Sequence, residues 1–350
     1  MTVAGENATL APQGQATAMD DPGRGRLPSA PLADASFGHL ETEPGQIGDG
    51  GLMLCGSERD APVTWTCFAE QINLELAERE RRGEVPKGYR LFYNPHNLLL
   101  TQIALGRPFA YLCWGAPKRG APWRRLRVER LRFILRAARV LLVHDVVTRR
   151  WIRRHVGREA ILVPLPVDMQ FFTPPPARRS GQGFLLVPGN NDRNEDYVLQ
   201  LAASWGRVVR VSSDPRTIER YAKSGPDTRV TLEYRIPWER LRELYRSAEA
   251  VVLPTGGTTH AGGQTAMLEA LACGARVLTD SPQLLSIARF WQLPVHRLPR
   301  DPSSVARVVG RLACDPTNGI RLPREFSLER CLATYKSVIG SAFKVPCGSQ

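Results

Sequence analysis

Apolar runs and amphipathic stretches alternate along the chain from about residue 63 onward. Short apolar runs rich in β-branched residues indicate buried strands, and apolar residues every three or four positions indicate helices. Strands that alternate with helices imply a parallel sheet with helices on both faces. In its first part the pattern predicts strands at 89–93, 107–113, 140–143 and 160–163, and helices at 68–82, 97–105, 123–138 and 146–156.

A second alternating series follows and has enough strands for a complete Rossmann-like unit. It predicts strands at 184–187, 208–211, 230–234, 250–253, 276–279 and 295–298, and helices at 197–203, 215–223, 238–248, 265–273, 282–288 and 327–343.

Composition divides the chain further. Residues 1–60 are rich in Gly, Pro, Ala, Asp and Ser and nearly lack aromatic residues, so they cannot bury enough apolar surface to offset their ordering entropy. The proline run that starts at Pro174 has linker composition. The predicted organisation is a disordered tail (1–60), a reduced N-terminal Rossmann-like domain (61–173), a linker (174–183), a complete C-terminal Rossmann-like domain (184–326), and a closing helix and tail (327–350).

Candidate chemistry follows the strand at 250–253, because ligands of a doubly wound sheet bind beyond the carboxyl ends of its strands. There Gly262-Gly263-Gln264-Thr265 precedes a helix whose first N–H groups and partial positive charge suit a diphosphate. Glu269 lies one turn further along the same face and can accept hydrogen bonds from both hydroxyls of a ribose. The alternative is a close-packed turn between strand and helix.

Residues 268–277, Leu-Glu-Ala-Leu-Ala-Cys-Gly-Ala-Arg-Val, resemble the signature helix of the group-1 (family 4) retaining glycosyltransferases. Residues 164–174 are similar to the family's hinge segment, and 230–246 to its strand and following helix. The resemblance covers roughly residues 85–340 and implies an α/β fold of the GT-B type, with two Rossmann-like domains, the first reduced, and a cleft between them. The domain at 61–173 would bind the acceptor, and the domain at 184–326 the nucleotide sugar.

The chain departs from the family at the donor site. Glu269 matches the second motif glutamate, but Ala261 stands where the first is expected, in a loop that resembles the family's Gly-Gln-Thr subset. His260 either takes over a polar role or is a solvated loop residue. The usual diphosphate arginine is replaced by Asn190, so Arg193 is the expected phosphate contact; the alternative is a surface arginine that caps the next helix.

The first domain offers no histidine at the family's usual acceptor position, where Trp114 stands instead. His96 and His144 remain, and His144, which follows a predicted strand, is the candidate to face the cleft. His144 and His260 are therefore the candidate catalytic residues.

The charge balance favours anionic partners, since 47 Lys and Arg against 34 Asp and Glu give a net charge of +13. Arginines gather between residues 118 and 154, which suits peripheral contact with an anionic membrane, an ordinary solvated face, or nucleic acid. No nucleic-acid-binding motif supports the last, and a GC-rich coding bias would also enrich arginine. The seven scattered cysteines form no CxxC pair, and neither a membrane span nor a secretory signal is evident, so we expect a cytoplasmic protein, peripheral on the inner membrane face.

Together these features predict an enzyme of the hexosyltransferase type. It would move a sugar, with retention and without a metal or cofactor, from a nucleotide-sugar donor to a saccharide or lipid-linked acceptor, in polysaccharide biosynthesis. The alternatives are a non-catalytic nucleotide-binding protein of the same fold and a nucleotide-sugar epimerase.

Overall fold

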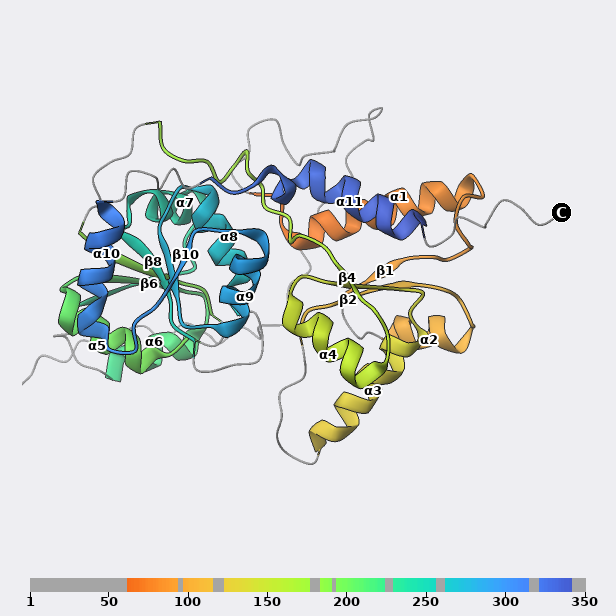
Figure 1. The fold of residues 1–350 in the computed structure, drawn as a ribbon, viewed down its shortest axis with the longest axis horizontal. Coiled ribbons are helices and arrows are strands. Elements are labelled where there is room, and N and C mark those ends of the chain that lie inside the picture. Colours follow the sequence, from red (N-terminus) through yellow and green to blue (C-terminus); the bar gives the residue numbers. More distant parts are fainter. Residues whose placement is uncertain are drawn as a thin grey trace, which may run out of the picture. The chain divides into compact units, whose positions relative to one another are not determined.

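The computed structural model describes residues 62–93, 97–115, 123–176, 183–190, 193–223, 229–255, 262–314 and 321–341. All of them belong to one compact unit, Leu54–Gln350. They contain two parallel β-sheets, which Figure 1 shows with their helices. The predicted tail at 1–60 and the stretch 177–182 of the predicted linker lie outside the described residues.

The first sheet has four strands in the order β1-β2-β3-β4, all parallel. Its two central strands are fully buried apolar runs, as is expected of strands that are covered on both faces. The strands are β1 (Leu91–Phe92), β2 (Ala110–Cys113), β3 (Val140–Val143) and β4 (Ile161–Leu162), and the helices are α1 (Trp65–Arg81), α2 (Asn97–Ala104), α3 (Trp123–Ala137) and α4 (Val146–Val156).

The second sheet has six parallel strands in the order β10-β9-β8-β5-β6-β7. This is the order of a complete Rossmann unit, in which the chain direction across the sheet reverses between β5 and β8. Its strands are β5 (Leu185–Pro188), β6 (Val208–Ser212), β7 (Val230–Tyr234), β8 (Ala250–Leu253), β9 (Val277–Thr279) and β10 (Val295–Arg297).

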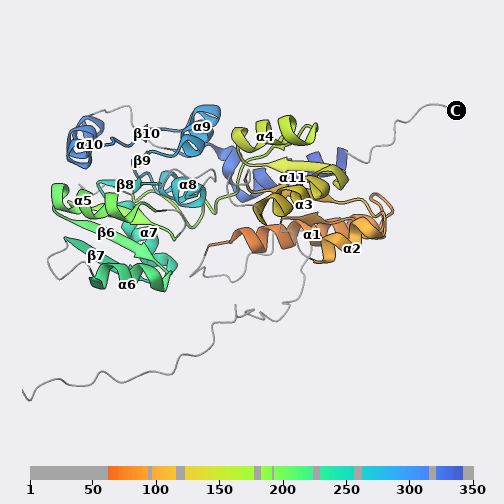
Figure 2. The ribbon, with the colours of Figure 1, turned by 90° about the horizontal axis from the view of Figure 1, so that it is seen from below.

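Alternate side chains of the central strands enter two separate cores. Leu186 and Val251 pack on the face that α7 (Trp238–Ser247), α8 (Gln264–Ala272) and α9 (Pro282–Trp291) cover. Leu185 and Val252 pack on the opposite face, beneath α5 (Glu195–Trp205), α6 (Pro215–Lys223) and α10 (Val305–Ala313). Figures 1 and 2 show this sandwich of helices around the six strands. The chain ends its described part with α11 (Leu328–Ser341), and two 3₁₀ turns lie at Pro302–Ser304 and Arg324–Phe326.

The structure differs from the sequence prediction mainly at element ends. Strand β1 is shorter than the predicted 89–93, because the Tyr89 N–H donates to Pro86 O in a turn rather than to a neighbouring strand. Helix α1 begins earlier than predicted, since the Thr64 side chain accepts from Cys67 N–H and caps it. Helix α10 was not predicted, although Val305 and Val309 give it a buried face with a spacing of four residues. No described helix has the length and apolarity needed to span a membrane.

Candidate functional site

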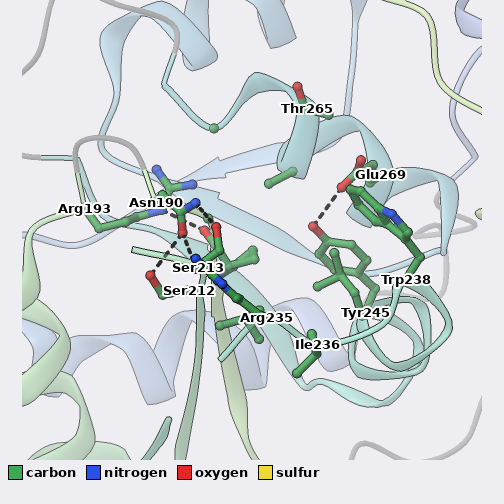
Figure 3. A pocket seen from close by; sticks show the side chains of 16 residues that line it. Asn190, Arg193, Ser212, Ser213, Arg235, Ile236, Trp238, Tyr245, Thr265 and Glu269 are labelled. Carbon is green, nitrogen blue, oxygen red and sulfur yellow. Dashed lines mark hydrogen bonds between the residues drawn. The ribbon is translucent and has the colours of Figure 1, made fainter. Parts of the chain in front are cut away.

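A cavity of about 500 Å³ opens at the carboxyl end of β5, beside the point where the strand order reverses. A parallel sheet leaves a crevice at this point, which is where ligands bind in such folds. Figure 3 shows Asn190 and Arg193 on one side and Glu269 with Tyr245 on the other. The lining residues are Pro188, Gly189, Asn190, Arg193, Val211, Ser212, Ser213, Arg235, Ile236, Trp238, Leu241, Tyr245, Gly263, Thr265, Ala266 and Glu269.

The Arg193 guanidinium lies between two glycines that have left-handed backbones. A Cβ added to Gly189 (φ 94°) would lie 2.9 Å from Arg193 Nη2, and one added to Gly263 (φ 92°) would lie 2.8 Å from the same atom. Arg193 Nε also donates to Pro188 O at 2.8 Å. Two residues without side chains therefore make room for a cation between the end of β5 and the start of α8.

The start of α8 adds a second source of positive potential. Gly263 is its N-cap, and no side chain among the described residues caps this helix end. The first N–H groups of a helix lack partners within it, and its dipole places a partial positive charge there. Thr265, in this first turn, is exposed and lines the cavity. A guanidinium beside an uncapped helix start is a combination suited to an anion with several oxygens.

Glu269 lies one turn deeper in α8 and is 8% exposed. The Tyr245 hydroxyl donates to Glu269 Oε2 at 3.0 Å. Burial raises the pKa of Glu269 to about 8, and the tyrosine hydrogen bond offsets only part of this rise. Burial and the neighbouring carboxyl raise the pKa of Tyr245 well above its ordinary value, so the phenol keeps its proton and remains the donor. The wall of the cavity thus presents a carboxyl group whose charge a ligand can change.

Asn190 links the end of β5 to the end of β6 through hydrogen bonds. Its Oδ1 accepts from Ser212 Oγ at 3.0 Å and from Ser213 N–H at 2.7 Å. The amide group therefore shapes the cavity wall and brings no charge to it.

Arg235 and Trp238 line the cavity from the β7–α7 connection, and the sequence reasoning missed both. Arg235 has a left-handed backbone (φ 50°), and its N–H donates to Ser212 O at 3.0 Å. Its guanidinium lies 5.1 Å from the centre of the Tyr234 ring. Trp238 is 39% exposed. The sequence does contain a signal for Arg235, because this residue directly follows a predicted strand and ligands bind beyond the carboxyl ends of the strands of such a sheet.

A fully buried arginine supports the loop that carries Gly189. Arg210 donates to Val187 O at 3.2 Å and to Gly189 O at 2.7 Å. It also pairs with Glu195 at 2.8 Å, and the Tyr221 hydroxyl donates to Glu195 Oε2 at 2.7 Å. Burial of a charged side chain is costly, and the hydrogen bonds and the ion pair of Arg210 explain how the fold tolerates it.

The structure brings together four of the predicted binding residues: Arg193, Gly263, Thr265 and Glu269 all line the cavity. Gly262 directly precedes Gly263, whereas Gln264 is buried and does not line the cavity. Arg193 does not cap α5; Asn194 does, by accepting from Tyr197 N–H at 3.1 Å. His260 and Ala261 lie outside the described residues, as does His96.

His144 belongs to the first sheet, directly after β3, and not to this cavity. It is 2% exposed, and burial lowers its pKa to about 4, so the imidazole is neutral at pH 7. Its Nδ1 lies 3.1 Å from Val163 O. A carbonyl can only accept, so Nδ1 carries the proton and Nε2 carries a lone pair. Among the described residues, groups of three or more His, Cys, Asp or Glu side chains that could hold a metal ion do not occur.

Comparison with solved structures shows the fold. The chain is similar to sucrose-phosphate synthase from Thermosynechococcus elongatus, with 18% identity, a TM-score of 0.52, and coverage of 79% of this chain and 76% of that one. It is also similar to Anabaena HepE in complex with UDP, with 12% identity, a TM-score of 0.56, and coverage of 79% of this chain and 82% of that one. A glycosyltransferase from Rickettsia africae ESF-5 is similar too, with 10% identity, a TM-score of 0.56, and coverage of 80% of this chain and 83% of that one. No protein-family model matches the sequence, and no curated protein sequence matches it.

These likenesses, with the two parallel sheets, confirm the predicted fold class: the chain has the GT-B fold of two Rossmann-like domains. Among the described residues, the first sheet has four strands and the second has six.

Proposed function

We propose that this protein is a glycosyltransferase that takes its sugar from a nucleotide-sugar donor, with the donor's diphosphate on Arg193 and the first turn of α8. One observation carries the proposal: the Arg193 guanidinium fits between Gly189 and Gly263, directly at a helix start that has no side-chain cap in the described structure. The cavity around it has the volume expected of a small-molecule site.

The remaining walls suit the rest of a nucleotide. The carboxyl group of Glu269, which keeps its proton at neutral pH, would exchange hydrogen bonds with the ribose hydroxyls, as its place one turn into α8 suggests. The base would lie toward Arg235 and Trp238, where an exposed indole offers a flat apolar surface. The Anabaena HepE structures contain UDP and UDP-glucose, which supports uridine nucleotides as the first candidates.

The chemistry follows from the charges. When the bond between the sugar and the diphosphate breaks, negative charge grows on the leaving phosphate oxygen. Arg193 and the α8 N–H groups would stabilise that charge. On this basis transfer would proceed without a divalent ion, which predicts equal rates with and without a chelator. Retention of configuration, hexosyl transfer and membership of the group-1 family rest on the resemblance of residues 268–277 and 164–174.

A thermal-shift screen against UDP, GDP, ADP and their common sugar conjugates, in the presence of a chelator, tests the proposal. A nucleotide at about 100 times its dissociation constant stabilises the fold by about 2.7 kcal/mol. We expect a shift with one nucleotide class, lost in Arg193→Gln and kept in Arg330→Gln, which removes an exposed charge on α11. No shift with any nucleotide would contradict the proposal.

A non-catalytic nucleotide-binding protein is the second candidate, and Asn190 favours it. Its amide oxygen is held by Ser212 and Ser213, so the position brings no charge to the leaving group. Nucleotide binding without release of UDP, GDP or ADP from any sugar conjugate, with acceptors present, would select this alternative. Product that forms without an acceptor would select an epimerase.

We also propose that the acceptor is a saccharide or a lipid-linked saccharide, reached through peripheral contact with an anionic membrane. Leu126 is 76% exposed and Phe133 is 53% exposed, although both are large apolar residues. They lie seven residues apart on α3, so they share a helix face, and Arg130 lies between them on that face. Apolar side chains flanked by arginine are what an interfacial helix needs.

A further inference from the structure

The first sheet carries an aromatic cluster at the carboxyl ends of three neighbouring strands. Tyr93 follows β1, Trp114 follows β2 and His144 follows β3. Trp65, the first residue of α1, lies at the centre: its ring centre is 5.9 Å from that of Tyr93, 5.2 Å from that of Trp114 and 5.5 Å from that of His144. The centres of the Trp114 and His144 rings are 5.1 Å apart. Four distant segments therefore converge where ligands bind in parallel sheets.

The cluster has a buried floor and an open edge. Phe68, His144 and Tyr335 are each at most 2% exposed, and the Tyr335 ring centre lies 5.4 Å from that of Phe68 and 6.0 Å from that of Trp65. Trp114, in contrast, is 38% exposed. Its ring thus separates the buried part of the cluster from solvent.

Polar atoms without partners concentrate in this cluster. Among the described residues, three buried side-chain atoms of this cluster lack a hydrogen-bond partner: Trp65 Nε1, His144 Nε2 and Tyr335 Oη. Native proteins leave few such atoms unpaired, and a group of them in one place indicates a missing partner. The indole N–H is a donor, the imidazole Nε2 is an acceptor, and the phenol can be either. Hydroxyl groups, which donate and accept, match this set.

The surroundings select against a charged ligand. The imidazole is neutral, and the rings in the cluster carry no charge. Two buried carboxyl groups belong to or bond with segments of this cluster: Asp145, which follows His144, accepts from Thr148 N–H at 2.7 Å, and Asp168 accepts from Val63 N–H, two residues before Trp65, at 3.0 Å. Two buried carboxyl groups disfavour a phosphate or carboxylate, and the rings offer no partner to a strongly hydrated ion.

We propose that Trp65, Tyr93, Trp114 and His144 form a binding subsite for a neutral saccharide ring, stacked on Trp114 and hydrogen-bonded through a hydroxyl group to His144 Nε2. A pyranose combines apolar C–H faces with hydroxyl groups, which fits an exposed aromatic face above unpaired donors and acceptors. Because Nε2 is covered in the absence of ligand, the Trp114 side chain must turn outward as the ring enters. This subsite rests on the proposed function, since it would hold the saccharide that receives the transferred sugar.

Tryptophan fluorescence titrations with the methyl glycosides of glucose, galactose, mannose and N-acetylglucosamine test the subsite. We expect at least one glycoside to change the emission saturably. Trp114→Ala should weaken this binding about tenfold or more, measured by ligand-observed NMR because the variant lacks the reporting ring. Phe290→Ala, which removes another exposed aromatic side chain (49%), should leave it unchanged.

His144→Asn separates the hydrogen bond from the fold. The Asn amide nitrogen can replace Nδ1 as donor to Val163 O, but no atom replaces Nε2. We expect weaker glycoside binding by about fivefold in this variant and no change in His155→Asn, an exposed histidine on α4. If His144→Asn does not fold, Trp114→Ala decides alone.

Thermal shifts with UDP, GDP and ADP on the same variants distinguish the two proposals. Glycoside binding that Trp114→Ala weakens, with nucleotide shifts intact, supports the subsite. Nucleotide shifts in the wild type without binding of any of the four glycosides, or glycoside binding that Trp114→Ala leaves unchanged, overturn it. Loss of nucleotide binding in the wild type counts against the proposed function instead.

Discussion

The Arg193 guanidinium has room beside β5 and α8 because its two neighbours there are glycines. Gly189 and Gly263 come from different loops, and each contributes a left-handed backbone and an absent Cβ at the same guanidinium. A side chain at either position would meet Arg193 Nη2 at less than 3 Å. The glycines leave room for the guanidinium and the bond to Pro188 O holds it, so its position would be preorganised for the proposed leaving diphosphate.

Gly263→Ala tests this packing. The new Cβ would displace the guanidinium and strain the backbone, so we expect nucleotide affinity to fall about tenfold and stability to fall by about 1 kcal/mol. Gly206→Ala is the matched control, because Gly206 also has a positive φ (104°) but nothing lies within 4 Å of the added Cβ. Calorimetric titration and urea unfolding measure both variants. Equal nucleotide affinity in the two variants would show that the glycine gap does not position Arg193.

Glu269 makes stability depend on pH with a defined sign. Burial raises its pKa to about 8 from the ordinary 4.5, so at neutral pH the folded chain keeps a proton that the unfolded chain has lost. Its contribution to the free energy of unfolding is complete below about pH 4.5 and is lost as the pH rises through about 8. We expect Glu269→Gln to reduce the fall in stability between these two pH values. Glu329→Gln, at an exposed site, should leave this fall unchanged. Urea midpoints measured across this range that fall equally in the wild type and in Glu269→Gln would contradict the assignment.

At the scale of elements, β6 supports the β5–α5 connection through a buried ion pair. Arg210 is fully buried, and Glu195 opens α5 with a side chain that is 12% exposed. Removal of one member of such a pair leaves an uncompensated buried charge. Since Arg210 also donates to Gly189 O, the cost extends to the loop that carries Gly189.

Arg210→Met should therefore lower stability by about 3–5 kcal/mol. Arg240→Met, which breaks the more exposed pair with Glu233, should cost about 1 kcal/mol or less. Denaturant unfolding measures both, and the addition of Glu195→Gln to Arg210→Met should recover part of the loss. Similar losses in Arg210→Met and Arg240→Met would rule out a supporting role for the buried pair.

Helix α3 is the element that tests membrane contact. We expect Leu126→Ser with Phe133→Ser to reduce co-sedimentation with anionic vesicles severalfold, because two exposed apolar side chains would no longer enter the interface. Leu105→Ser, at another exposed leucine (57%), should not reduce it. Binding that is equal for neutral and anionic vesicles, or absent in the wild type, would exclude this surface.

At the scale of the whole molecule, local sequence patterns predicted more of the fold than of the site. The fully buried strands β5 and β8 are continuous apolar runs, so their positions follow from composition and spacing alone. The predicted strands at 89–93 and 160–163 are longer than β1 and β4, and at β1 the cause is the Tyr89 N–H, which donates to Pro86 O in a turn. Helix α10 was missed although its four-residue apolar spacing is plain in the sequence.

The site shows where sequence reasoning stops. Arg193 was predicted as the available cation after the first strand of the second series and Glu269 from its place in the following glycine-led helix, and both line the cavity. Arg235 and Trp238 come from another loop, and only the strand order brings them there. The cluster around Trp65 joins residues 65, 93, 114 and 144, and no local pattern links positions so far apart. The catalytic roles of His144 and His260 stay predictions, and His260 lies outside the described residues.

The central claim is that Arg193 and the start of α8 hold the diphosphate of a nucleotide. Calorimetric titration of UDP and uridine, or of the corresponding pair for another base, into the wild type and Arg193→Gln tests it most directly. The account predicts that the diphosphate tightens binding by about a hundredfold or more in the wild type, and that Arg193→Gln removes most of this gain while nucleoside affinity stays the same. An equal gain from the diphosphate in both proteins would contradict the account.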